Sequence, residues 1–245
     1  MSKRYNFPEW LNKSKFDQYQ LEQIKEGIKS GLDTSIYASP EFRSDQMEQI
    51  RYGLETKVDV SVYADPKFDS QQMEEIKKGL WKDIDVSVYT KPEFNSRQMR
   101  QIRYGLENEI DASIYANPRF DSAQMEQIRY GLESKLDVSF YADQELNCDQ
   151  MSQIREGLKE GLDVSVYANP ELNSEQMAKI RLELKSKEQE NSCLEKFTEP
   201  SDVEEINESS EFLDYVDSIV EKTKQEQQTL LEKRIKSIIT QGEEH

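Results

Sequence analysis

The sequence predicts an all-α solenoid of 26-residue repeats, each a long helix followed by a short helix, with a further helix at the C-terminal end. One apolar position recurs every 26 residues without insertion or deletion, and polar residues suited to helix capping recur at fixed places around it. Only 35% of the residues are hydrophobic, which is typical of a stacked array with a shallow core. The recurring apolar residues are Leu21, Met47, Met73, Met99, Met125, Met151 and Met177.

The periodicity also divides the chain. Residues 1–15 are predicted to form an N-terminal cap in which Trp10 and Leu11 cover the open face of the first repeat. Residues 16–185 contain six full units and the first helix of a seventh. A pair of helices this short cannot bury its apolar face alone, so we expect successive units to stack.

The long helix of each unit is predicted to span about 12 residues. Met47, Ile50 and Leu54 show the apolar spacing of one buried stripe. A serine stands near each expected helix start, where an N-cap side chain accepts hydrogen bonds from the amides of the first turn. These serines are Ser44, Ser70, Ser96, Ser122 and Ser174.

The short helix is predicted from an aspartate that recurs before the sequence V-S-V-Y-A. The aspartate suits the N-cap of a helix of one or two turns, partly 3₁₀. Because V-S-V-Y contains β-branched residues, a short strand is the alternative. A following proline, such as Pro66, is expected to end this helix. Gln144 replaces the proline in the fifth unit, so a looser junction is expected there.

Four further positions hardly vary between units. Glutamines such as Gln98 and glycines such as Gly105 share one helix flank. Glycine inside a helix lowers stability by roughly 1 kcal/mol relative to alanine, so its recurrence predicts a close helix–helix approach. The glutamine is expected to bond across that approach. A basic residue such as Arg51 is expected to pair with acids one turn away or with the recurrent aspartate. The tyrosine of V-S-V-Y is expected to be a buried ring with its hydroxyl at the edge.

Composition excludes several functional classes. The chain has 49 acidic and 32 basic residues, a net charge of −17, which disfavours nucleic acids and membranes and favours a protein partner with a basic surface. Its one histidine is His245, which removes histidine-dependent triads and metal centres, and Cys148 and Cys193 form no metal or redox motif. We therefore predict no enzyme, no catalytic residue, no cofactor and no metal. Without an apolar stretch for a signal peptide or membrane span, a cytoplasmic location is expected.

The repeat also resembles a known type. Its pattern Q-M-x-x-I-R-x-G-L…L-D-V-S-x-Y-A-x-P, over residues 16–185, resembles the tandem repeats of proteins from conjugative elements and phages of Gram-positive bacteria. In architecture it is similar to the leucine-rich-repeat-variant solenoids. These resemblances imply a bacterial mobile element and a binding role, and they carry no catalytic residue over to this chain.

Beyond the repeats, residues 186–210 are rich in acidic residues, serine and asparagine and are predicted to be a flexible linker. Residues 211–241 are predicted to form an amphipathic helix, which fits docking against the array or into a partner groove better than a coiled coil. The oligomeric state is left open.

These observations favour a non-enzymatic protein-binding scaffold. The alternative is an anti-defence inhibitor, of the anti-CRISPR or anti-restriction type, that occupies a basic groove of a nucleic-acid-binding protein. On a helical wheel, four aromatic residues of the second to fifth units point away from the buried stripe. Either neighbouring repeats cover them or a partner packs on them, and they are the predicted partner-binding residues. They are Tyr52, Trp81, Tyr104 and Tyr130.

Overall fold

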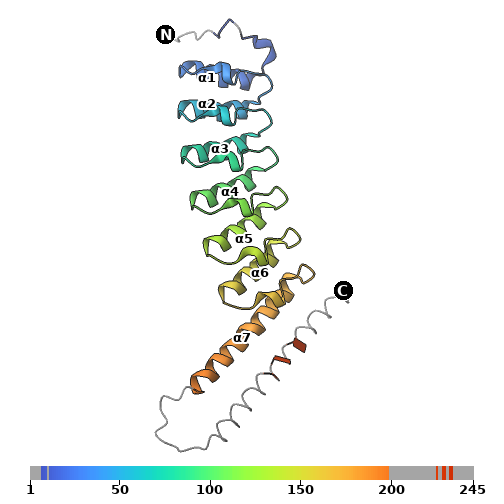
Figure 1. Cartoon of the computed structure of the whole chain (residues 1–245). Helices are drawn as coiled ribbons and strands as arrows, with labels where there is room; N and C mark the ends of the chain where they lie inside the picture. Colours follow the sequence, from blue (N-terminus) through green and yellow to red (C-terminus); the bar gives the residue numbers. More distant parts are fainter. Residues whose placement is uncertain (1–6, 10, 199–224, 226–227, 230–231, 234–245) are drawn as a thin grey trace, which may run out of the picture. The chain divides into compact units, whose positions relative to one another are not determined.

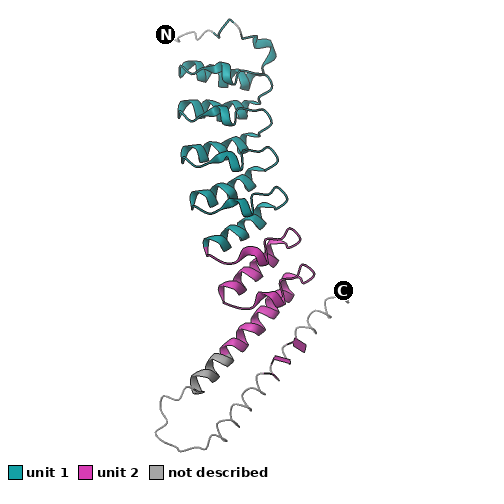
Figure 2. Cartoon of the chain, in the orientation of Figure 1, with its two compact units in different colours: residues 1–133 teal, residues 134–245 magenta. Residues whose placement is uncertain are grey.

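The computed structural model describes residues 7–9, 11–198, 225, 228–229 and 232–233 (Figure 1). The chain divides into two compact units, residues 1–133 and 134–245 (Figure 2). The residues described are helical or irregular and include no strand, and long helices pack in succession within each unit. The predicted all-α solenoid class is therefore confirmed.

In the first unit, each long helix contacts the next along the chain, one layer for each repeat (Figure 1). The long helices are α1 (Gln18–Lys29), α2 (Ser44–Glu55), α3 (Ser70–Trp81), α4 (Ser96–Glu107) and α5 (Ser122–Glu133). The 3₁₀ segments are η1 (Lys13–Lys15), η2 (Thr34–Ile36), η3 (Val60–Val62), η4 (Val86–Val88) and η5 (Ala112–Ile114).

The second unit contains η6 (Val138–Phe140), α6 (Cys148–Lys159), η7 (Val164–Val166) and α7 (Ser174–Thr198), and α6 packs on α7. Because α7 continues to Thr198, the prediction of a flexible linker from residue 186 is wrong for residues 186–198, which are helical. The run of good helix formers after Lys185 contains neither proline nor glycine, so nothing local ends the helix there.

Three sequence predictions concern residues largely outside the described ones. The rest of the expected linker, residues 199–210, and most of the expected helix 211–241 lie there. Trp10 of the expected N-terminal cap is also outside, whereas its neighbour Leu11 is buried, with 6% of its surface exposed.

The helix starts correct one detail of the sequence analysis. The N-cap is the residue before the serine: the Asn95 side chain accepts from the backbone N–H groups of Arg97 and Gln98, both at 3.0 Å. Ser96 is the first helical residue, and its hydroxyl donates to Gln71 of the preceding helix at 3.2 Å. Asn and Asp are as strong as Ser at the cap, so composition alone did not decide between neighbouring positions.

The recurrent glutamine links successive repeats. Gln98 closes a capping box by accepting from the backbone N–H of Asn95 at 2.8 Å. Its amide nitrogen donates to the carbonyls of Phe120 at 2.6 Å and Pro118 at 3.0 Å, which precede the next long helix. Glutamine thus bonds across the repeat interface, but it joins one helix start to the next and does not bridge the predicted close approach at the glycines.

The short segments are 3₁₀ turns, so the strand alternative is excluded for them. Asp59 caps η3 by accepting from the backbone N–H of Ser61 at 3.0 Å, which confirms the predicted role of the recurrent aspartate. The segment ends at Tyr63, before Pro66, so the prediction that proline ends it is wrong.

Proline instead occupies the second position of a β-turn. In the second repeat, the Phe68 amide donates to the Asp65 carbonyl at 3.1 Å across Pro66, and proline is favoured there because its φ is preset. In the fifth repeat, the same turn closes around Gln144 at 3.3 Å, between the Leu146 amide and the Asp143 carbonyl. Gln144 thus replaces proline with only a slightly longer bond.

The recurrent glycine packs against the recurrent tyrosine of its own repeat. A Cβ at Gly53 would lie 2.0 Å from the Tyr63 hydroxyl oxygen, and the Tyr63 ring is fully buried. The predicted helix–helix approach at the glycines is therefore wrong, because the close neighbour is the 3₁₀ segment that folds back on the helix. The buried tyrosine ring was predicted correctly.

Candidate functional site on the outer surface of α2 to α5

The basic residue of each long helix reaches the preceding repeat. The Nε of Arg51 donates to the Gln23 side chain at 3.1 Å, and the Nε of Arg129 donates to Gln101 at the same distance. Lys77 makes the equivalent bond to Gln49 at 2.8 Å. A single column of cations thus joins α1 through α5 by side-chain hydrogen bonds.

These cations are largely buried, with 5–8% of each residue exposed. Arg51 also pairs with Glu55 one turn along at 2.7 Å, as predicted. The recurrent aspartate, the other predicted partner, accepts from its own 3₁₀ segment instead. The column is therefore more than a set of surface ion pairs within one helix, because it links repeats as well.

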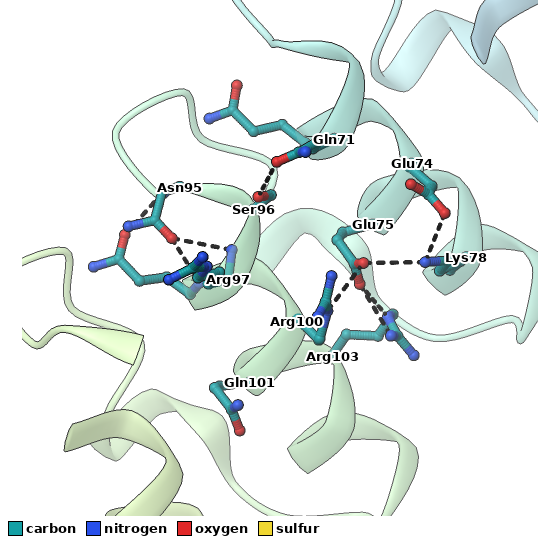
Figure 3. Close-up of polar contacts among 12 residues, drawn as sticks. Gln71, Glu74, Glu75, Lys78, Asn95, Ser96, Arg97, Arg100, Gln101 and Arg103 are labelled. Carbon is teal, nitrogen blue, oxygen red and sulfur yellow. Dashed lines mark hydrogen bonds and ion pairs between the residues drawn. The ribbon is translucent and has the colours of Figure 1, made fainter. Parts of the chain in front are cut away.

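One junction, between α3 and α4, replaces the neutral acceptor of this column by a carboxylate. Glu75 stands where the other first-unit helices carry glutamine, and only 1% of it is exposed. Arg103 lies 3.0 Å from it, Lys78 3.1 Å and Arg100 3.3 Å (Figure 3). We call these four residues, with Glu75 at the centre, the Glu75 cluster.

The cluster satisfies a buried charge with an excess of cations. Burial alone would lower the pKa of Arg103, but the carboxylates of Glu75 and Glu107 raise it. Burial would likewise lower the pKa of Lys78, whereas hydrogen bonds to Glu74 and Glu75 raise it. Arg103 and Lys78 therefore stay charged at neutral pH, and the cluster fixes α3 against α4.

The same two helices are less acidic than their neighbours. In α3 two lysines oppose two glutamates, a net charge of 0, and in α4 three arginines oppose one glutamate, a net charge of +2. By contrast, the residues of α2 sum to −2 and those of α5 to −1. The outer surface of α3 and α4 is a positive region in a chain of net charge −17.

The four predicted partner-binding residues lie on this outer surface. Trp81 in α3 is 61% exposed, Tyr52 in α2 42%, Tyr104 in α4 38% and Tyr130 in α5 37%. We call these four residues the outer aromatic surface. Their exposure leaves large apolar areas available to a partner.

The tyrosine rings also have a packing role, in line with the alternative that neighbouring repeats cover them. The Arg51 guanidinium lies 4.4 Å from the Tyr52 ring centroid, and that of Arg103 lies 4.6 Å from the Tyr104 centroid. Arg129 adds a contact from the next repeat at 5.7 Å from Tyr104. These cation–π contacts hold the rings in place and explain why tyrosines accompany the buried cations.

Sequence reasoning missed the Glu75 cluster. Three of its members break a repeat column: Glu75 replaces glutamine, Lys78 stands at the position of Tyr52 and Tyr104, and Arg100 replaces glutamate. Trp81, one turn from Lys78, replaces the glutamate of the neighbouring repeats as well. Departures from the repeat gathered at one junction were the available signal.

Among the residues described, no group of three or more histidine, cysteine, aspartate or glutamate side chains is placed to hold a metal ion. No described helix has the length and apolar character needed to cross a membrane. Comparison with protein-family models, with curated proteins and with solved structures gave no match.

Proposed function

We propose that this chain is a non-enzymatic, protein-binding repeat scaffold whose partner contacts the outer aromatic surface. The observation that carries the proposal is Trp81, which is 61% exposed on a helix whose neighbours have glutamate at that position. Because the neighbouring repeats stack with glutamate at this position, the stacking of repeats does not require an aromatic ring there. Exposed tryptophan, tyrosine and arginine are the residues that contribute most to binding hot spots.

The cation–π contacts support the same surface. Tyr52 and Tyr104 are exposed yet held by buried arginines, so little conformational entropy is lost when a partner packs on them. The resemblance of the repeat to those of conjugative elements and phages adds a bacterial mobile element as the proposed setting. An inhibitor that imitates nucleic acid is less well supported, because the positive region of α3 and α4 interrupts any continuous acidic surface.

The test is partner capture with matched variants of the full chain from a lysate of a Gram-positive bacterium. Tyr104→Ala with Tyr130→Ala is expected to weaken binding of the captured protein by at least about 2 kcal/mol, roughly thirtyfold. Tyr19→Ala is the control, because Tyr19 is 74% exposed on α1, which contributes no residue to the outer aromatic surface. Circular dichroism confirms that each variant folds.

A double variant that folds and binds its partner as tightly as the wild type does would show that the outer aromatic surface is not the recognition site. If the double variant unfolds, Tyr104 and Tyr130 are needed for the packing of the repeats. Partner binding by Trp81→Ala then tests the outer aromatic surface without these two rings.

A further inference from the structure

The departures from the repeat at α3 and α4 leave exposed cations along the two helices, one of which ends at the exposed Trp81. Lys82 follows Trp81 directly, and its side chain is 59% exposed; that of Arg100 is 46% exposed and that of Lys78 36%. Arg97, one turn before Arg100, is exposed as well. We call Lys78, Lys82, Arg97 and Arg100 the basic patch.

The patch keeps a surplus of positive charge after its ion pairs are counted. In α3, α4 and the Lys82–Asp83 pair that follows α3, six lysines and arginines oppose four carboxylates, those of Glu74, Glu75, Asp83 and Glu107, a surplus of two. Glu75, at the centre of its cluster, is almost wholly buried, so it is out of reach of a partner (Figure 3). An approaching molecule therefore meets the exposed cations and the Trp81 ring, together with the carboxylates of Glu74 and Asp83.

From this arrangement we infer that the basic patch and Trp81 bind an acidic segment of a protein, one in which carboxylates flank an aromatic or aliphatic residue. This inference rests on the proposed function and names the chemistry of the partner. The carboxylates pair with lysine and arginine, and the apolar side chain packs on the indole. The net charge of the whole chain led to the expectation of a partner with a basic surface. The inference replaces that expectation with an acidic partner.

Charge screening explains why the local surplus prevails over the net charge of −17. At physiological ionic strength, charges further than roughly 8 Å from a binding segment are largely screened. A short acidic segment confined to α3 and α4 meets the positive region alone. A nucleic acid duplex extends further and also meets the negative helices α2 and α5, so it is the less suitable ligand.

The experiment is a selection of displayed random peptides on the full-length wild-type chain, followed by binding measurements of the selected peptides. Peptides that bind the wild type and lose at least tenfold in affinity on Trp81→Ala are expected to be acidic and to contain an aromatic or aliphatic residue. Lys82→Glu with Arg97→Glu is expected to reduce their affinity at least tenfold, whereas Lys25→Glu on α1 leaves it unchanged. Lys82 and Arg97 are exposed and Lys25 is partly exposed, and melting curves verify the fold.

The alternative outcomes separate this inference from the proposed function. Trp81-dependent peptides that are neutral or basic would overturn the acidic partner while leaving a protein-binding role intact. If no selected peptide depends on Trp81, Tyr52 or Tyr104, both proposals are wrong. Two other results would overturn the inference. If the chain self-associates in sedimentation and Lys82→Glu with Arg97→Glu abolishes this association, the occupant is a second copy of the chain. If a DNA duplex binds and its binding depends on Trp81, the occupant is nucleic acid.

Discussion

The hydroxyl of Tyr115 lies where a side chain at Gly105 would begin: a Cβ on Gly105 would be 1.9 Å from the tyrosine oxygen. The hydroxyl donates to the backbone carbonyl of Gln101 at 3.2 Å, one turn earlier in α4. Glycine is therefore retained in this helix, despite its low helical propensity, because it makes room for a buried hydrogen bond.

Gly105→Ala is expected to destabilise the protein by about 1–3 kcal/mol through overpacking. Tyr115→Phe in the same chain is expected to recover much of this loss, because it removes the oxygen and leaves Cζ, 3.1 Å from the new Cβ, as the nearest atom. Urea unfolding of both single variants and the double variant measures the coupling. If the stability changes of the two single variants simply add in the double variant, the glycine is not retained to make room for the tyrosine hydroxyl.

Removal of the buried carboxylate at the α3–α4 junction is expected to be costly. Glu75→Ala removes the carboxylate that Arg103, Arg100 and Lys78 share, and breaking a buried ion pair in this way costs about 3–5 kcal/mol. Arg103 keeps Glu107 and Lys78 keeps Glu74, so the loss is expected at the lower end of this range. Glu75→Gln should cost less than half as much, because an amide oxygen can still accept from Arg103 as Gln23 does from Arg51. Free energies of unfolding, measured for both variants, show which of them is the less stable.

Gln101→Ala is the matched control, since Gln101 stands at the same repeat position one helix later and accepts from Arg129. Loss of that bond is expected to cost about 1 kcal/mol. Equal losses for Glu75→Ala and Gln101→Ala would mean that the charge at Glu75 adds nothing.

The helix ends contain a removable source of strain. Lys57 follows α2 with a φ of 61°, and the amides of Lys57 and Val58 bond back to Leu54 and Gly53 in a Schellman arrangement. Gly31 has the same left-handed conformation after α1, with a φ of 71°. A non-glycine residue in this conformation costs roughly 1 kcal/mol.

Lys57→Gly is therefore expected to stabilise the protein by about 0.5–1 kcal/mol, measured as a higher urea midpoint. Lys67→Gly is the control, because Lys67 is exposed in a turn and has no positive φ, and it is expected to be neutral or destabilising. A loss of stability in Lys57→Gly would contradict the strain argument.

The buried tyrosines make the fold sensitive to alkali. Burial raises the pKa of Tyr37 from 10.0 to about 12, and it raises the pKa values of the corresponding tyrosines of the other repeats as well. Because the folded pKa lies above the unfolded value, folding favours the neutral phenol. That contribution is complete below pH 10 and is lost as the pH rises from 10 to about 12.

Each such tyrosine is expected to contribute a slope of up to about 1.4 kcal/mol per pH unit in this window. Urea unfolding across the window, followed by circular dichroism, should show a steep fall in stability. Tyr37→Phe should reduce the slope of stability against pH by the contribution of one tyrosine. Tyr19→Phe, which changes an exposed ring, is the control. A stability that does not change with pH would show that the buried rings ionise as readily as in the unfolded chain.

The sequence predicted the candidate surface better than the contacts within it. The helical wheel alone indicates that Tyr104 and Trp81 point outward, since orientation follows from spacing within one helix. The contacts of Glu75 with Arg100 and Arg103 join residues 25 and 28 positions apart. Which side chains meet there depends on how far α4 is displaced along α3, and spacing within one helix does not set this displacement.

What the sequence by itself determined is everything that follows from local chemistry repeated at a fixed interval. The 26-residue period, the apolar stripe of Met47 and Ile50 and the Asp59 cap need only neighbours within a few residues, so the helices and their order could be predicted. Tertiary structure decided the rest. The fold-back of Tyr115 onto Gly105 and the burial of Glu75 among cations arise only when segments pack, because each depends on where a second backbone comes to lie.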